Sequence, residues 1–183
     1  MTQLTQNAAA GISDGARVNP SDTNAETGSA QFLTFLCDGE EYGIDILRVQ
    51  EIKGWESATR VPHAAPYVLG VMNLRGMIVP VINLRTRFGL ADRPFDASTV
   101  VIVVKMHGAD RDRTVGIVVD AVSEVYGFTA AAIKPPPAVG GRADGACISG
   151  IATTSDRKMV MLLDIDRLID VKHVNDVRTA VGQ

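Results

Sequence analysis

Histidine and cysteine are the residue types that most often bind metals or act in catalysis, and the chain has three histidines and two cysteines. His63, His107 and His173 lie in different segments, without the i, i+4 or His-x-His spacing that brings ligands onto one metal ion. Cys37 and Cys147 form no Cys-x-x-Cys pair. Cys37 could act as a nucleophile beside a histidine, but it ends an apolar run, so we expect a buried, unreactive thiol.

Two shorter patterns also have a structural explanation. Asp164 and Asp166 form an Asp-x-Asp pair that could hold a divalent ion, but Asp164 is a good helix N-cap and Asp166 then suits the first turn. The segment Gly140-Gly141-Arg142 lacks the Gly-Lys-Ser/Thr ending of a phosphate-binding loop. The sequence therefore predicts no catalytic residue, no metal site and no cofactor, and so a protein that is not an enzyme.

Two charged residues stand in unusual places. Arg75 lies in Asn73-Leu74-Arg75-Gly76, at an expected turn between two apolar strands, and Glu51 lies in a strand with Val49 and Ile52. Such charges are usually only solvated. Both flank the repeated segments described below, however, and a planar guanidinium suits a specific polar contact across an interface. We therefore treat both residues as candidate binding residues.

Composition narrows the class of protein. The 183 residues are 46% hydrophobic, enough for a core of one compact unit or two closely packed ones. A net charge of −3 and a pI of about 5.6 disfavour a nucleic-acid partner. The aliphatic run at residues 100–104 is too short to cross a bilayer, and the N-terminus lacks the pattern of an export signal. We expect a cytoplasmic protein with reduced thiols and no direct membrane insertion.

Both ends and one internal segment lack the features of packed structure. Residues 1–30 contain no aromatic side chain and are rich in small and polar residues, which predicts a disordered tail. Residues 134–145, KPPPAVGGRADG, predict a surface connection between strands. Residues 173–183 are expected to be frayed. One domain of two interleaved β-barrel modules should then span residues 31–172.

Short β-branched segments separated by turn signals fill this domain. Asp38-Gly39 favours a tight hairpin, Pro80 indicates a strand edge, strand end or bulge, and a C-terminal helix should start at Asp164. About ten strands predict an all-β protein of two packed five-stranded β-barrels with short helices. The expected strands are 32–36, 41–46, 49–55, 71–75, 77–82, 100–106, 113–119, 122–126, 148–153 and 158–163, with a helical turn at 84–88.

The chain also contains a weak internal repeat. Residues 42–52, YGIDILRVQEI, align with residues 115–125, VGIVVDAVSEV, and residues 70–84 align with residues 150–165. In the second pair a glycine precedes an apolar run, and an Asn or Asp closes it. The repeat predicts two similar modules and hence two faces. The matched residues include Gly43 and Gly116, Ile44 and Ile117, Val49 and Val122, and Glu51 and Glu124.

Three separated segments resemble a known family. EEYGIDILRVQEI from Glu40, GVMNLRGMIVPVINLR at residues 70–85 and TVGIVVDAVSEV at residues 114–125 closely resemble CheW, the family of coupling proteins of bacterial chemotaxis. The resemblance extends from about residue 32 to about residue 169. It implies two small β-barrels packed together, a hydrophobic groove at their junction, and no catalysis.

The resemblance also implies partners. In the family, one surface holds the regulatory domain of the histidine kinase CheA, and the groove holds the hairpin tip of a methyl-accepting chemoreceptor. Gly70 matches a kinase-binding position, where a side chain would hold the partner away. The positions that match receptor-side residues are Arg75, Val49, Glu51, Val100 and Val125.

The function implied by the resemblance is that of a non-catalytic adaptor in two-component signal transduction. Such a protein is cytoplasmic and is recruited to membrane-associated receptor arrays. An adaptor for a chemosensory system with another output, such as pilus-based motility, fits the same residues. A small-molecule sensor or enzyme site in the groove would require converging polar groups, and the sequence offers only scattered ones.

Overall fold

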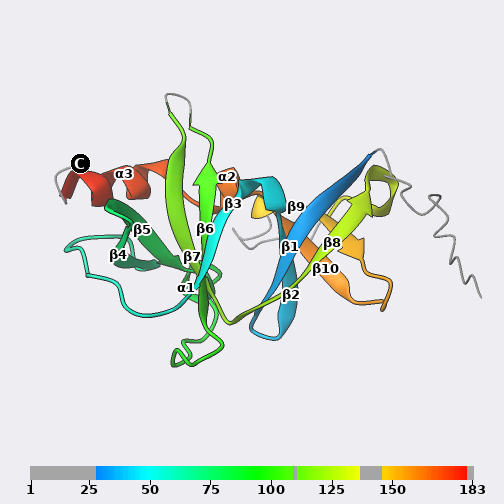
Figure 1. Ribbon diagram of the computed structural model, residues 1–183, viewed down its shortest axis with the longest axis horizontal. Helices are drawn as coiled ribbons and strands as arrows, with labels where there is room; N and C mark the ends of the chain where they lie inside the picture. Colours follow the sequence, from blue (N-terminus) through cyan, green and yellow to red (C-terminus); the bar gives the residue numbers. More distant parts are fainter. Residues whose placement is uncertain (1–27, 109–110, 137–145, 181–183) are drawn as a thin grey trace, which may run out of the picture.

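The computed structural model describes residues 28–108, 111–136 and 146–180, so most of the predicted N-terminal tail and of the predicted 134–145 connection lies outside the described residues. The described residues form two five-stranded sheets (Figure 1), which confirms the predicted all-β class. The strands are β1 (Ser29–Cys37), β2 (Glu40–Asp45), β3 (Val49–Gly54), β4 (Val68–Leu74), β5 (Met77–Asn83), β6 (Val100–Met106), β7 (Arg113–Val119), β8 (Ala121–Thr129), β9 (Ile148–Thr153) and β10 (Met159–Leu163). The helical elements are η1 (Ile46–Arg48), α1 (Leu84–Arg87), η2 (Ala130–Ala132), α2 (Ile165–Leu168) and α3 (Val171–Ala180).

Each sheet combines strands from both repeats. Sheet A has the order β8-β1-β2-β10-β9, and sheet B has the order β3-β6-β7-β5-β4. The first repeat therefore leaves β1 and β2 in sheet A and sends β3, β4 and β5 to sheet B, while the second repeat does the reverse. Each sheet has one parallel pairing, β2 with β10 and β5 with β7, and these pairings join the two repeats. The two predicted modules are thus present, with their strands exchanged.

Turn chemistry behaves as the sequence predicts. Asp38 and Gly39 both have positive φ, 56° and 79°, which suits the two-residue turn between β1 and β2.

Pro80 lies in β5, an internal strand, but the parallel ladder with β7 begins only at Val81. On the other side Val71, opposite Pro80, gives its N–H and C=O to Thr59, so Pro80 needs no N–H there.

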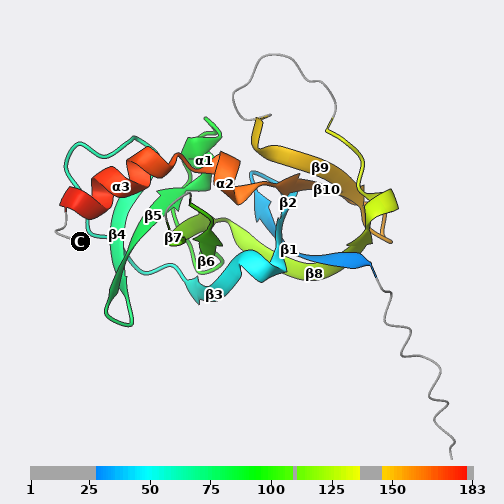
Figure 2. The ribbon, with the colours of Figure 1, turned by 90° about the horizontal axis from the view of Figure 1, so that it is seen from above.

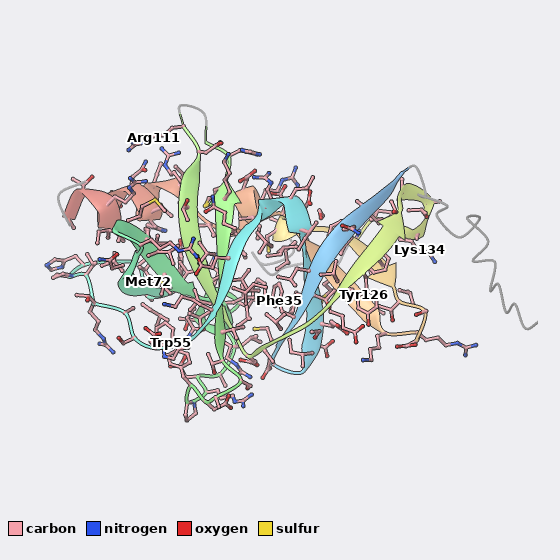
Figure 3. All side chains as sticks on the ribbon, viewed as in Figure 1. Phe35, Trp55, Met72, Arg111, Tyr126 and Lys134 are labelled. Atoms are coloured by element: carbon pink, nitrogen blue, oxygen red, sulfur yellow. The ribbon has the colours of Figure 1, made fainter. Side chains whose placement is uncertain are left out.

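The largest apolar core lies between the two sheets. Leu33, Phe35 and Ile44 enter it from sheet A, and Ile102 and Ile117 from sheet B. A smaller cluster that includes Met72 lies in sheet B, and another, against which Tyr126 packs, lies in sheet A. Figure 3 shows Phe35 between the two sheets, with Met72 and Tyr126 on either side. Because β6 contributes to two clusters, its side chains are apolar on both faces, which explains the unbroken valine-rich run at residues 100–104.

The C-terminal region differs from the prediction. Asp164 caps α2 as expected, because its Oδ1 accepts hydrogen bonds from the backbone N–H groups of Asp166 and Arg167. The predicted fraying from residue 173 is wrong for the described part, since α3 runs to Ala180. Val174 and Val177 of α3 are buried, and these two residues were too few to give a clear helical pattern. Within the described residues, no helix is long and apolar enough to cross a bilayer.

Candidate protein-binding site

The apolar candidate residues lie on one side of the molecule. β3 and β8 are edge strands of the two sheets and run along the side opposite α1, α2 and α3 (Figure 2). In the ladders, Val49 of β3 is opposite Val104, and Val125 of β8 is opposite Leu33. Both opposing residues belong to the core between the sheets, so Val49 and Val125 project toward that same region. Val100 of β6 packs against this core as well.

Ile52 was missed as a binding candidate. It is opposite Ile102, a residue of the core between the sheets, and therefore shares the side of β3 that carries Val49. Its side chain is 42% exposed, close to the 49% of Val125. The alignment of residues 42–52 with 115–125 already matched these two residues, so the signal was available in the sequence. The apolar side chains on this side form what we call the edge-strand face: Val49, Ile52, Val100, Val122 and Val125.

A β-bulge interrupts both edge strands at matching places. The ladder of β3 with β6 shifts between Val49 and Glu51, and the ladder of β8 with β1 shifts beside Thr34. There the Thr34 hydroxyl donates to the Glu124 carbonyl (2.9 Å) and accepts from the Glu124 N–H (3.2 Å). Bulges twist an edge strand and oppose uncontrolled edge-to-edge pairing. Both edge strands are therefore twisted beside the exposed apolar side chains, which opposes their pairing with a strand of another molecule.

Glu51 and Arg75 meet on the other side of β3. Glu51 is opposite Val103, which belongs to the inner cluster of sheet B, so Glu51 points away from the edge-strand face. Arg75 lies in the β4–β5 turn with a φ of 53°, and its Nη2 is 3.1 Å from Glu51 Oε2. The arginine side chain is 79% exposed. Such a pair adds little stability, but it holds the guanidinium in one direction at the surface.

Gly70 lies apart from both of these groups. The resemblance predicts that a side chain at this position would hold the kinase away, and the surroundings of Gly70 give a different reason for the glycine. It is buried in β4, with a φ of 143°. A Cβ here would lie 2.0 Å from the carbonyl oxygen of Thr59, because Thr59 and Val71 exchange two backbone hydrogen bonds of 2.8 Å. A side chain at this position would therefore first collide with the chain's own backbone rather than with a partner.

The two cysteines, Cys37 and Cys147, are both buried, as their places in the sequence predict. Burial, followed by the nearby Asp120 carboxylate, raises the pKa of the Cys37 thiol to about 12, so it is protonated and unreactive at neutral pH. In the described part of the chain, no group of three or more His, Cys, Asp or Glu side chains is placed to hold a metal ion.

The predicted site residues thus fall into three places. Val49, Val100 and Val125 share the edge-strand face, Glu51 and Arg75 form a surface ion pair across β3, and Gly70 lies buried beneath the loop before β4. This arrangement offers apolar contact, one oriented cation and no reactive group. It is suited to binding another protein rather than to turnover of a substrate.

Comparisons with known proteins agree with the resemblance. A profile of the CheW-like domain matches residues 31–173. The chemotaxis protein CheW of Klebsiella aerogenes is 42% identical over 144 residues, covering 79% of this chain and 84% of that protein. CheW of Bacillus subtilis is 31% identical over 140 residues, covering 76% and 86%.

A solved structure gives the same result for the fold. The crystal structure of the scaffolding protein TtCheW from Thermoanaerobacter tengcongensis matches with a TM-score of 0.70 and 35% sequence identity. The match covers 79% of this chain and 95% of that one. The chain therefore belongs to the CheW-like domain family and is a non-catalytic chemotaxis adaptor, as its three sequence segments predicted.

Proposed function

We propose that this protein couples methyl-accepting chemoreceptors to the histidine kinase CheA, as a cytoplasmic adaptor recruited to membrane-associated receptor arrays. The observation that carries the proposal is the edge-strand face. Ile52 and Val125 are large apolar side chains left exposed at corresponding positions of two edge strands. Contiguous exposed apolar surface on a folded protein commonly marks an interaction site.

The receptor contact is supported by the apolar side chains of this face. A receptor tip is a helical hairpin, and a helix packs its apolar side onto apolar side chains of a partner. The edge-strand face supplies such side chains from both sheets, including Val49, Val100 and Val125. Arg75, held by Glu51, adds a directed positive charge beyond β3. These five residues support a receptor contact with an apolar part on the edge-strand face and a polar part on the other side of β3.

Kinase binding is assigned to the region of Gly70. A molecule that binds CheA through one surface and a receptor through another can join repeated units into a closed ring. Signalling contacts of this kind are small, and they become effective through repetition in a lattice. We expect modest pairwise affinities and cooperative assembly.

The decisive test is CheA autophosphorylation with receptor-containing membranes, with and without this protein. We expect a large increase that requires all three components. No increase with a cognate kinase and receptor would contradict coupling and favour the adaptor of a system with another output, such as pilus-based motility.

Substitution of Arg75 tests the polar part of the receptor region. Arg75→Ala should leave the denaturation midpoint unchanged, because an exposed ion pair contributes little stability, and should reduce kinase activation several-fold. Arg157→Ala is a matched control, since Arg157 occupies the β9–β10 turn with a similar φ of 63°. Equal activation by wild type and Arg75→Ala, or equal loss in both variants, would remove Arg75 from the site.

A further inference from the structure

The backbone of the loop between β3 and β4 packs directly against Gly70. The loop begins after Gly54 and passes Trp55 (Figure 3). Thr59 then bridges to Val71 through two backbone hydrogen bonds, from Thr59 N–H to Val71 O and from Val71 N–H to Thr59 O. This bridge places the Thr59 carbonyl carbon and the Arg60 Cα 2.6 and 3.0 Å from where a Cβ of Gly70 would be. Any side chain at position 70 would thus displace the loop before it could touch another molecule.

The second repeat contains the same arrangement. Gly150 of β9 is buried, and Lys134 bridges Ile151 with two backbone hydrogen bonds of 2.8 Å. A Cβ on Gly150 would lie 2.6 Å from Ile133 Cγ2 and 3.2 Å from the Lys134 carbonyl oxygen. Since both repeats place a glycine under a bridging segment, the glycine is needed by the packing of the chain itself.

The loop that packs against Gly70 carries two side-chain hydrogen-bond donors that line a depression. A depression of about 270 Å³ is lined mainly by residues of this loop and by the start of β4, including Arg60, Val61, His63, Pro66, Val68 and Leu69. Arg60 and His63 are exposed, and within the described residues neither makes a hydrogen bond or ion pair. The nearest acidic residue in the loop, Glu56, is paired instead with Lys53 (3.7 Å). The depression therefore offers a guanidinium and an imidazole without an acceptor.

We infer that Gly70 is a positioning residue for kinase binding, and that the contact itself is made by Arg60 and His63 of the seated loop with a carboxylate-bearing surface of CheA. The inference rests on the proposed function. A guanidinium and an imidazole N–H that line one depression complement a carboxylate, which accepts charge-assisted hydrogen bonds from both. An Asp or Glu side chain of the kinase is the occupant that this chemistry favours.

The test measures binding of full-length CheA to the full chain by calorimetry, together with amide hydrogen exchange of the free protein. Arg60→Glu should weaken binding at least tenfold and leave exchange at the Thr59 and Val71 amides unchanged. Gly70→Ala should weaken binding and also speed exchange at both amides at least tenfold. Arg111→Glu is the control, because Arg111 is an exposed arginine at the far end of sheet B from Trp55 (Figure 3), and it should bind as wild type does.

Salt dependence gives a second readout. Binding by the wild type should weaken between 50 and 300 mM salt more steeply than binding by Arg60→Ala, because a charge pair is screened by ions. Normal CheA binding by Arg60→Glu would overturn the inference, as would loss of binding by Gly70→Ala with unchanged amide exchange. Failure of the wild type to bind CheA would instead overturn the proposed function, and this inference with it.

Discussion

The strand order takes the chain from one sheet to the other twice, and an ion pair holds each linker in place. The linker carries the cation in one pair and the anion in the other. At the first crossing, between β2 and β3, the linker supplies a cation: Arg48 Nη2 is 2.7 Å from Asp166 Oδ2 of α2. At the second crossing, between β7 and β8, the linker supplies an anion. Asp120 receives two hydrogen bonds of 2.8 Å from the Arg85 guanidinium of α1.

The rest of each crossing is closely matched. Arg85 and Asp166 are each the second residue of the short helix after a hairpin, and their N–H groups bond to Asn83 Oδ1 and Asp164 Oδ1. In each case the carboxylate of the pair also accepts a backbone N–H from the turn that ends the first strand of a repeat. These bonds run from Asp38 N–H to Asp120 (2.9 Å) and from His107 N–H to Asp166 (2.9 Å).

The two crossings differ in burial. The side chains of Arg85 and Asp120 are 11% and 14% exposed, against 23% and 31% for Arg48 and Asp166. Asp38 adds a second carboxylate 3.1 Å from Arg85. In both crossings the carboxylate of an opposite-charge pair also accepts a turn N–H, although the linker carries the cation in one and the anion in the other. Burial then decides how much each pair stabilises.

The largest effect should follow from removing the buried carboxylate. Asp120→Ala leaves the Arg85 guanidinium largely buried without its main partner, and we expect a loss of about 3 kcal/mol in the free energy of unfolding. Asp166→Ala should cost only about 1 kcal/mol, because that pair is more exposed. Urea denaturation of both variants checks this order. Equal losses would show that burial does not distinguish the crossings.

A charge exchange sharpens the comparison. Arg48→Asp combined with Asp166→Arg would give the first crossing the polarity of the second. If polarity is interchangeable, the double variant should be less destabilised than the sum of the two single variants by about 1 kcal/mol. A double-mutant cycle in urea provides the measurement, and strictly additive losses would mean that the polarity of this crossing is fixed.

The smallest effect is a dependence on pH. The hydrogen bonds from Arg85 hold the pKa of Asp120 below its ordinary value. A lowered folded-state pKa stabilises the fold above the unfolded value of about 4, and this stabilisation is lost as the pH falls through the folded-state pKa. The difference in the free energy of unfolding between wild type and Asp120→Asn should therefore be largest at pH 7. It should shrink below a pH of about 4. A gap that stays constant under acid denaturation would exclude this origin.

Signals between neighbouring residues were enough to predict individual strands, turns and caps. They were not enough to predict that strands are exchanged between the two sheets. The hairpin at Asp38-Gly39 and the cap at Asp164 depend on neighbouring residues, so both could be predicted. The alignment of residues 42–52 with 115–125 indicated two modules. It could not show that β3 leaves the sheet of β2, because that choice depends on contacts between residues more than fifty positions apart, such as Arg48 with Lys105.

The candidate site was predicted in part for the same reason. The resemblance pointed to Val49 and Val125, and strand registers later placed them on one face. Glu51 and Arg75 were each noticed as unusual charges, but their ion pair appears only when the β4–β5 turn reaches β3. The need for glycine at position 70 comes from the backbone of Thr59, which no pattern of side chains reveals.

The exchanged strands have a consequence for synthesis of the protein on the ribosome. All strands of sheet B lie between β3 and β7, so this sheet can be completed once Val119 has emerged. β1 and β2 emerge first, yet their sheet needs β8, β9 and β10, which end only at Leu163. Domains generally fold as units from the N-terminal side during translation. Here β1 and β2 must wait for β10, so a nascent chain exposes the apolar side chains of β1 and β2 until Leu163 has emerged.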